Sequence, residues 1–256
     1  MKTTLFAATL VVALSLSAVA AQKKPPVSQH LKGSPESGPV FTGQGTPPAL
    51  CDPCLFYGGD LNPVAPNAAG MSDENTLFIP GSSTYASFNV ASGDAVTVTG
   101  ILVNVQASAN FDPLTASYDV RTGVSEGNGG TSIASGTGAV QVAATGRNFI
   151  GLNEFSVAVQ LSTPLLLGPG RYWFNVTPSC TNGAQDGSCS AGRIFVSNTT
   201  QRANSVYGID QTDHQMYLNS PFFGISWANW CDADIFGFNK EQCRDMSFGL
   251  MGTHQN

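Results

Sequence analysis

Six cysteines carry the clearest chemistry in this chain of 256 residues. They fall in three close pairs: Cys51 and Cys54, Cys180 and Cys189, and Cys231 and Cys243. In an exported chain, an even number of cysteines predicts disulfides. Six cysteines allow 15 pairings, and pairing between near neighbours is the simplest of them. We therefore predict three local disulfides.

The segment Cys51-Asp52-Pro53-Cys54 also has the spacing of a redox motif. In thioredoxin-like proteins a helix N-terminus lowers the pKa of such thiols, whereas this segment follows a proline-rich stretch. A zinc site would need a second close pair or nearby histidines. The three histidines, His30, His214 and His254, lie far apart in the sequence. Structural disulfides are therefore favoured over both alternatives.

Acidic residues offer a second kind of chemistry. A glycosidase needs two carboxylates about 5 to 10 Å apart across a cleft, and the glutamates in the body of the domain are Glu74, Glu126 and Glu154. We expect Glu126 to be solvated in a Gly/Asn turn and Glu74 to tie a loop. A serine hydrolase needs a positioned base, but His214 has no Gly-x-Ser-x-Gly elbow to accompany it. We predict no catalytic residues, with a hydrolase using a carboxylate pair as one alternative.

Some acids lie in irregular, oxygen-rich segments that could bind calcium, which takes six to eight oxygen ligands. These groups are Asp60, Asp73 and Glu74; Asp210 and Asp213; and Asp232 and Asp234. None matches an EF-hand loop, and short Asp pairs commonly form turns. We predict no metal or cofactor, with a structural calcium ion as the alternative.

Aromatic residues near the C-terminus form the best candidate binding surface. Tryptophan combines an apolar ring with a polar tip, which suits a half-wet site, and neighbouring amides could orient sugar hydroxyls. The candidate residues are Phe222, Phe223, Trp227, Trp230, Asn219 and Asn229. The alternative is a loop whose aromatics pack on the domain and are held by a Cys231–Cys243 disulfide.

The elements that would position these residues are strands. Apolar residues alternate with polar ones in 155–161 and 172–176, with shorter runs at 85–90 and 193–196. Glycine-rich turns separate the runs, and no stretch has an amphipathic helical pattern. This pattern predicts an all-β fold, an antiparallel, jelly-roll-like β-sandwich. We expect 152–161 and 171–176 to pair as adjacent strands, with Val157 and Val159 facing the core beside Phe174.

A shift in the alternation marks Gly100. Val96 and Val98 share one face, and after Gly100 the apolar positions move to Ile101 and Val103. A change of register at a glycine indicates a β-bulge. A strand that is buried on both faces near its middle would also fit, because Leu102 is apolar.

The N-terminus predicts export. Lys2, the apolar stretch 5–16 and the small residues 18–20 form a secretory signal peptide, and the apolar stretch is shorter than the roughly 20 residues of a membrane span. Residues 21–50 are rich in proline and lack an apolar period, so we expect a disordered linker. We therefore predict a signal peptide at 1–20, a linker at 21–50, a β-sandwich domain at 51–256, no membrane span after cleavage, and a secreted or periplasmic location.

Composition agrees with an extracellular β-protein and argues against nucleic acid as a partner. Charged residues make up 11% of the chain, against roughly 25% in an average soluble domain. The net charge is −6, and the arginines are scattered singly, whereas a surface that follows phosphates needs clustered basic residues.

Several motifs together resemble a known family. They are the runs Leu55-Phe56-Tyr57-Gly58-Gly59-Asp60, Ser72-Asp73-Glu74-Asn75, Val120-Arg121-Thr122-Gly123-Val124-Ser125-Glu126-Gly127-Asn128-Gly129-Gly130, Leu167-Gly168-Pro169-Gly170-Arg171-Tyr172-Trp173 and Asn219-Ser220-Pro221-Phe222-Phe223-Gly224. In this order, over residues 55 to 250, the chain resembles a group of uncharacterised exported bacterial β-sandwich proteins. Some members carry a C-terminal sorting helix, which this C-terminus lacks. The resemblance implies no known activity.

We therefore predict an exported, non-catalytic β-sandwich protein with a structural or binding role at or outside the cell envelope. Its partner would be a polysaccharide or another envelope component. A carbohydrate-binding module is the first alternative, and the secreted hydrolase is the second.

Overall fold

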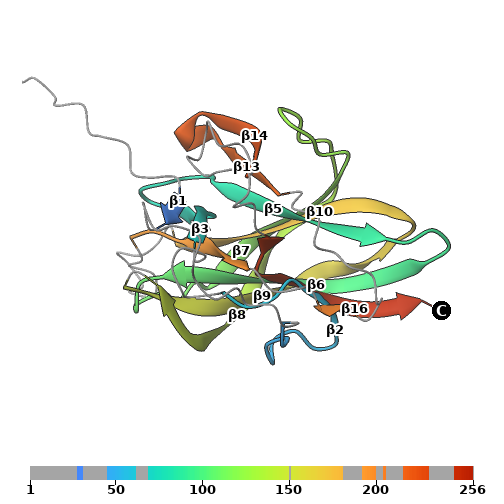
Figure 1. Ribbon diagram of the computed structural model, residues 1–256, viewed down its shortest axis with the longest axis horizontal. Helices are drawn as coiled ribbons and strands as arrows, with labels where there is room; N and C mark the ends of the chain where they lie inside the picture. The colour runs from blue at the N-terminus through green and yellow to red at the C-terminus, as the bar shows by residue number, and fades with distance from the viewer. Residues whose placement is uncertain are drawn as a thin grey trace, which may run out of the picture.

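The computed structural model describes residues 28–30, 45–61, 69–149, 151–180, 192–199, 204–205, 216–230 and 245–255. Within these residues the chain forms strands and one 3-10 turn, with no α-helix. Almost all strand pairs are antiparallel, and the sheet curls into a half-barrel that is compatible with a β-sandwich (Figure 1). The all-β prediction is confirmed. The predicted signal peptide lies outside the described residues, as does most of the predicted linker.

The strands follow one another in the order β1 (Ser28–His30), β2 (Cys54–Tyr57), β3 (Ala69–Ser72), β4 (Asn75–Thr76), β5 (Ser83–Val90), β6 (Ala95–Ala107), β7 (Thr115–Thr122), β8 (Thr131–Phe149), β9 (Leu152–Leu167), β10 (Gly170–Cys180), β11 (Phe195–Thr199), β12 (Asn204–Ser205), β13 (Tyr217–Ser220), β14 (Ile225–Asn229), β15 (Asp245–Met246) and β16 (Phe248–Gln255). The turn η1 (Pro221–Phe223) joins β13 to β14.

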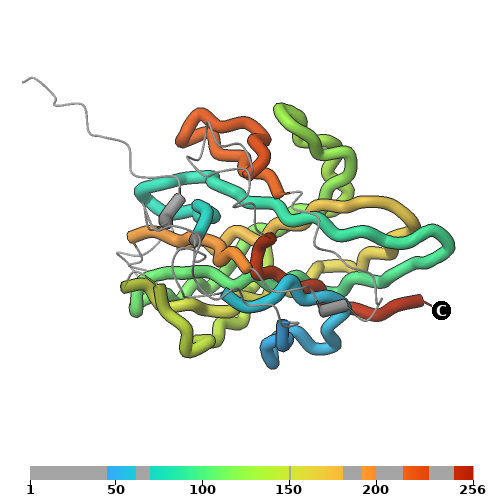
Figure 2. Tube along the Cα trace, in the orientation of Figure 1, coloured from blue at the N-terminus to red at the C-terminus, as the bar shows by residue number. Residues whose placement is uncertain are grey.

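Strand β8 connects the two layers of the fold. Its residues 131–139 pair with β7, and its residues 140–149 pair with β9. One layer therefore runs β3-β11-β6-β9-β8, and the path continues through β7-β10-β5-β13-β14 in the other. The tube in Figure 2 shows the chain crossing between these layers along β8.

Strands β9 and β10 are not neighbours in the sheet, so the predicted pairing of 152–161 with 171–176 is wrong. β9 pairs with β6 and β8, whereas β10 pairs with β5 and β7. The turn at 168–169 carries the chain from one layer to the other, and the turn at 91–94 does the same between β5 and β6. A short connection can thus form an arch between layers as well as a hairpin.

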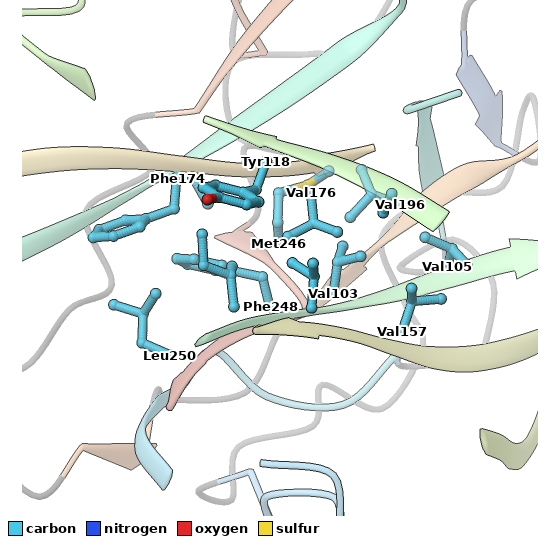
Figure 3. Close-up of a cluster of buried hydrophobic side chains, with 14 of the residues drawn as sticks. Val103, Val105, Tyr118, Val157, Phe174, Val176, Val196, Met246, Phe248 and Leu250 are labelled. Carbon is cyan, nitrogen blue, oxygen red and sulfur yellow. The ribbon is translucent and has the colours of Figure 1, made fainter. Parts of the chain in front are cut away.

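The core lies between the layers, and its side chains come from both. Val157 and Val159 from β9 share it with Phe174 from β10, as predicted (Figure 3). The rings of Phe174 and Phe248 are 6.1 Å apart between their centroids. The large apolar residues of alternating strands therefore do meet in one core, even though their strands belong to different layers.

The predicted bulge at Gly100 is confirmed. Met251 of β16 pairs with Gly100 and Gly252 with Val98, so Thr99 is the extra residue on β6. Residues 100–107 of β6 are also buried on both faces. Leu102 packs on the opposite face from the main core, in a smaller cluster with Tyr57 and Met251. The strand therefore has both features that the sequence pattern allowed, a bulge beside Gly100 and burial on both faces.

A disulfide joins Cys51 to Cys54 at the start of β2, with the sulfurs 2.11 Å apart. Cys51 belongs to the same small cluster as Leu102, so the disulfide fixes the segment that covers this outer face of β6 and β9. Cys180 is also disulfide-bonded. Its predicted partner, Cys189, lies outside the described residues, as does the predicted pair of Cys231 and Cys243.

Candidate functional site

The predicted aromatic surface lies on the hairpin of β13, η1 and β14. Phe222 and Phe223 are half-buried, with ring centroids 5.0 Å apart in an edge-to-face arrangement. Gly224 closes the turn in a left-handed conformation, with φ of 72°, and its N–H donates to the carbonyl of Pro221. Asn219 is also half-buried. The hairpin therefore presents two phenylalanine rings from a short, hydrogen-bonded turn.

Trp230 does not belong to this surface, which corrects the prediction. Its side chain is 2% exposed and lies in the main core. Trp227, by contrast, is half-buried at the edge of a separate cluster. Trp230 packs in the main core and Trp227 packs in the separate cluster with Tyr85, so the two side chains lie in different surroundings. They cannot form one stacking platform.

Trp227 is held tightly by neighbours from three elements. Its ring centroid is 4.7 Å from that of Tyr85, and the guanidinium of Arg121 lies 4.9 Å from it. Gly129 approaches the indole so closely that a Cβ there would overlap the ring. Trp227 also has a φ of 50°, a left-handed conformation that is unusual for a bulky residue. Such conformations persist where surrounding contacts impose them, and they are enriched at functional sites.

Arg121 is fixed in place by an ion pair with Asp119, whose Oδ2 lies 2.5 Å from Nη1. The same carboxylate accepts hydrogen bonds from the hydroxyls of Tyr85 and Ser132. Burial and the negative charge of Asp119 both raise the pKa of Tyr85. The group Tyr85, Asp119, Arg121 and Trp227, which we call the Trp227 cluster, is therefore a preorganised set of aromatic and charged side chains.

The β7–β8 turn completes this region. Glu126 is exposed, as predicted, and its Oε2 accepts a 2.8 Å hydrogen bond from the backbone N–H of Asn229. The N–H of Gly127 donates to the carbonyl of Trp227 at 3.0 Å. The turn therefore lies against β14, and the two project side by side in Figure 2.

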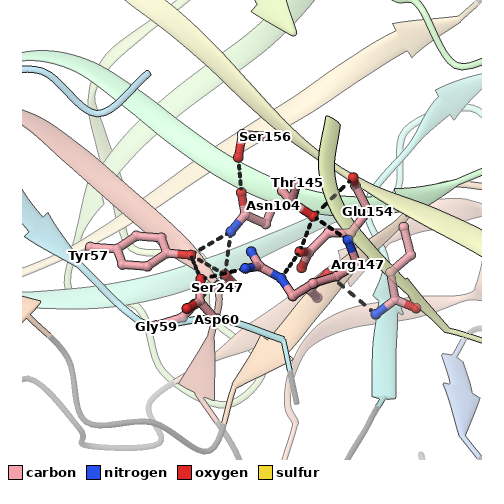
Figure 4. Close-up of polar contacts among 11 residues, drawn as sticks. Tyr57, Gly59, Asp60, Asn104, Thr145, Arg147, Glu154, Ser156 and Ser247 are labelled. Carbon is pink, nitrogen blue, oxygen red and sulfur yellow. Dashed lines mark hydrogen bonds and ion pairs between the residues drawn. The ribbon is translucent and has the colours of Figure 1, made fainter. Parts of the chain in front are cut away.

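A second polar group lies on the outer face of β6 and β9. The fully buried carboxylate of Glu154 accepts hydrogen bonds from Nε of Arg147 at 2.5 Å and from the hydroxyl of Thr145 at 2.8 Å. Nη1 of the same arginine lies 3.0 Å from Oδ1 of Asp60 (Figure 4). Arg147 thus joins β8 to β9 and to the segment that follows β2.

The network continues from Asp60 through Tyr57, whose hydroxyl donates to Asp60 at 2.8 Å. The amide of Asn104 donates to the hydroxyls of Tyr57 and Ser247, and Ser156 donates to Asn104. Burial, with the charge of Asp60, raises the pKa of Tyr57. Since Asn104 is fully buried, these bonds replace the water that its amide would otherwise need.

Asp73 and Glu74 are adjacent in sequence but point into different surroundings. Oδ1 of Asp73 accepts hydrogen bonds from the N–H of Thr84, the amide of Asn175 and the hydroxyl of Thr177. Burial raises the pKa of Asp73 to about 7. Oδ2 of this carboxyl is buried and has no hydrogen-bond partner among the described residues. Burial outweighs these three hydrogen bonds, so the Asp73 carboxyl takes up a proton at a higher pH than an exposed aspartate does.

Glu74 is fully buried and forms an ion pair with Arg193, whose Nε lies 2.9 Å from Oε1. Its other oxygen accepts the N–H of Ile194 at 3.1 Å. Burial raises the pKa of Glu74, and the charge of Arg193 opposes that shift. As the sequence predicts, Glu74 ties a loop, here to the residue before β11.

The candidate acids that the structure describes do not form one catalytic or calcium-binding group. Glu74, Glu126 and Glu154 have no hydrogen-bond partner in common, and the first and last are fully buried. Asp60 and Asp73 likewise belong to separate networks. Among the described residues, no three His, Cys, Asp or Glu side chains are grouped to hold a metal ion. The candidates His214, Asp210, Asp213, Asp232 and Asp234 lie outside the described residues.

Sequence reasoning missed one exposed apolar feature, the turn after β4. Leu77 is 64% exposed and Phe78 is 71% exposed. The hydroxyl of Thr76 accepts the N–H groups of Phe78 and Ile79, so the turn is locally fixed. The pairing of Asn219 with Ser83 places the start of β5 beside the end of β13. This turn and η1 therefore leave the same end of the sheet, although nothing in the sequence pattern links them.

The sequence pattern pointed to Trp227 but not to the other members of the Trp227 cluster, Tyr85, Asp119 and Arg121. Tyr85 lies in a predicted strand, but alternation alone cannot show which strand covers its outer face.

Comparison with protein-family models, with curated proteins and with solved structures gives no match to this chain. In the part of the chain that the structure describes, no helix has the length and apolar character to cross a membrane.

Proposed function

We propose that this chain is an exported β-sandwich protein with a structural or binding role at or outside the cell envelope. The observation that supports a non-catalytic role most directly is the state of Glu74 and Glu154. A general acid or base must reach the substrate, whereas these two carboxylates are fully buried and ion-paired with Arg193 and Arg147. Both link separate segments of the chain, which is a structural task.

Export is supported by the predicted signal peptide, by the Cys51–Cys54 disulfide, which suits an oxidising compartment, and by the resemblance to exported bacterial β-sandwich proteins. A secreted or periplasmic location follows from the same argument. N-terminal sequencing of the protein recovered from culture medium or periplasm tests it. We expect the mature chain to begin at Ala21 or Gln22, and recovery of an uncleaved chain from the cytoplasm would contradict export.

A carbohydrate-binding role is the second candidate, and the Trp227 cluster favours it. The half-buried indole of Trp227 lies beside the guanidinium of Arg121, which is paired with Asp119, so an apolar ring for sugar C–H groups and polar groups for hydroxyls are close together. Phe222, Phe223 and Asn219 lie on the same hairpin, and Phe78 is exposed on the turn that leaves the same end of the sheet. The ligand would be a polysaccharide of the envelope or its surroundings.

A glycan array probed with the full mature chain tests this role. We expect modest binding that changes little with salt, because no basic patch is available to release counterions. Phe222→Ala, Phe223→Ala and Phe78→Ala should each weaken binding without changing the melting temperature by more than a few degrees. Asp112→Ala, at an exposed position away from the hairpin sequence, is the matched control. Unchanged binding in all three phenylalanine variants would place the site elsewhere.

A further inference from the structure

The β7–β8 turn carries an Asn-Gly pair, the sequence in which an asparagine side chain reacts most readily with its own backbone. Asn128 is exposed, and Gly129 follows it. Glycine has no Cβ, so the peptide nitrogen of Gly129 can approach the Asn128 side chain without a clash. Exposure also lets water reach the same amide. The pair therefore has an unhindered nucleophile and access for water, which are two requirements for attack within the chain.

A hydrogen bond holds the Asn128 side chain over the peptide that follows it. Oδ1 of Asn128 accepts the N–H of Gly130 at 3.0 Å. This bond folds the side-chain carbonyl back along the chain, past the nitrogen of Gly129. A donor on Oδ1 also stabilises the negative charge that this oxygen gains when a nucleophile adds to its carbon. The turn therefore both positions and polarises the amide.

We propose that Asn128-Gly129 is a self-modification site, at which Asn128 converts to aspartate and isoaspartate through a cyclic imide. The backbone nitrogen of Gly129 gives up its proton and attacks Cγ of Asn128. A bond from nitrogen to Cγ forms, the bond from Cγ to Nδ2 breaks, and the Nδ2 group leaves as ammonia with that proton. Water then opens the ring. Hydrolysis at Cγ gives aspartate, and hydrolysis at the main-chain carbonyl carbon gives isoaspartate, so water is the only co-reactant.

Isoaspartate acts on the Trp227 cluster because it lengthens the main chain by one methylene between residues 128 and 129. Reciprocal backbone bonds between Ser125 and Asn128, both 2.9 Å, close the turn. The carbonyl of Gly129 accepts a hydrogen bond from Nε of Arg121, and a Cβ on Gly129 would overlap the Trp227 indole. A longer main chain cannot keep the closed turn and both Gly129 contacts. Conversion therefore loosens the turn from the cluster, whether or not the cluster binds sugar.

Peptide mapping of the full mature chain, before and after incubation in mildly alkaline buffer, tests the proposal. We expect the peptide that contains residue 128 to gain the mass of an OH in place of an NH2, and to become a substrate for an isoaspartate methyltransferase. Asn110 and Asn148 are also exposed but precede phenylalanine, so they should keep their amides. The other Asn-Gly pair, Asn182-Gly183, lies outside the described residues, and tryptic peptides separate it from Asn128.

A variant links the modification to the cluster. Asn128→Gln would need a larger ring for the same attack, so it should remain unconverted. The N–H of Gly127 donates to the carbonyl of Trp227 at 3.0 Å, and its hydrogen exchange should become several-fold faster in incubated wild type but not in incubated Asn128→Gln. Circular dichroism confirms that both proteins remain folded.

Two results would overturn the proposal. The first is a folded chain that keeps the Asn128 amide under conditions in which a free peptide of residues 125–131 loses it, since the turn would then hinder the attack. The second is a converted chain in which the Gly127 amide exchanges as slowly as in Asn128→Gln, since the modification would then leave the contact with β14 unchanged.

Discussion

Glu74 and Arg193 lie 119 residues apart in the sequence and form an ion pair of 2.9 Å, with the carboxylate fully buried. The pair ties the loop after β3 to Arg193, two residues before β11 begins at Phe195. The guanidinium also lies 4.6 Å from the ring of Phe195 and 5.8 Å from that of Phe223. Arg193 thus connects the buried acid to the aromatic hairpin.

Glu74→Gln should lower the free energy of unfolding by roughly 3 kcal/mol, because breaking a buried ion pair leaves one charge poorly compensated. Urea denaturation followed by tryptophan fluorescence measures it. Glu126→Gln, at an exposed carboxylate, should change stability by less than about 0.5 kcal/mol. If Glu74→Gln is as stable as that control, the ion pair makes no net contribution to the fold.

Asp73 predicts an unusual dependence of stability on pH. Its pKa is about 7 in the folded protein and about 3.9 in an unfolded chain. Between these values the folded protein retains a proton that the unfolded chain releases, so stability falls as pH rises through this window, by an amount on the order of 4 kcal/mol. Burial raises the pKa of Glu74 as well, which acts in the same direction.

Asp73→Asn should flatten this profile, because an amide oxygen can accept the bonds from Thr84, Asn175 and Thr177 without carrying a charge. Urea midpoints at about pH 5 and about pH 8 provide the comparison. Asp112→Asn is the matched exposed control. A wild-type protein that gains stability between these pH values, or an Asp73→Asn variant with the same slope as wild type, would show that Asp73 is ionised when folded.

The strands were predictable because burial imposes a period of two on the sequence, and Val157, Val159 and Phe174 follow it. The bulge at Gly100 was predictable for the same reason, since an extra residue shifts the period. Pairing between strands was not, because a short turn such as 168–169 can form either a hairpin or an arch. Local alternation carries no information on which of these it forms.

The candidate site was predictable only in part. Aromatic and amide composition pointed to the hairpin that carries Phe222 and Trp227. Burial of Trp230 depends on contacts with distant strands, which composition does not reveal. Several partners of Glu154 and Asp73 also come from distant segments. The sequence around these acids therefore cannot distinguish a pair of catalytic carboxylates from two buried carboxylates that hold segments of the chain together.

The two tryptophans of the hairpin should respond differently to truncation. Trp230→Ala removes a fully buried side chain from the main core and should lower stability by about 3 to 5 kcal/mol. Trp227→Ala removes only a half-buried ring and keeps the Cβ that makes the left-handed backbone unfavourable, so its loss should be smaller. Thermal unfolding by circular dichroism gives both values. Equal losses would mean that Trp227 is as much a core residue as Trp230.

The disulfide prediction extends beyond Cys51 and Cys54. Local pairing of Cys180 with Cys189 and of Cys231 with Cys243 should stabilise the fold by about 2 to 3 kcal/mol each in the chain-entropy model. Peptide mapping under non-reducing conditions should find all six cysteines in bridges between near neighbours. A free thiol, or a bridge between distant cysteines such as Cys51 and Cys243, would contradict local pairing.

Gly252, which pairs beside the bulge of β6, should tolerate no side chain. Its φ is 154°, and a Cβ there would collide with the carbonyl of Thr97. Gly93 also has a positive φ, 89°, but a Cβ there would meet open space. Gly93→Ala should therefore cost only the conformational penalty of about 1 to 2 kcal/mol, whereas Gly252→Ala must also move the backbone and should lose more than about 3 kcal/mol. Denaturant unfolding of the two variants separates the effects, and equal losses would mean that β16 can shift freely against the bulge.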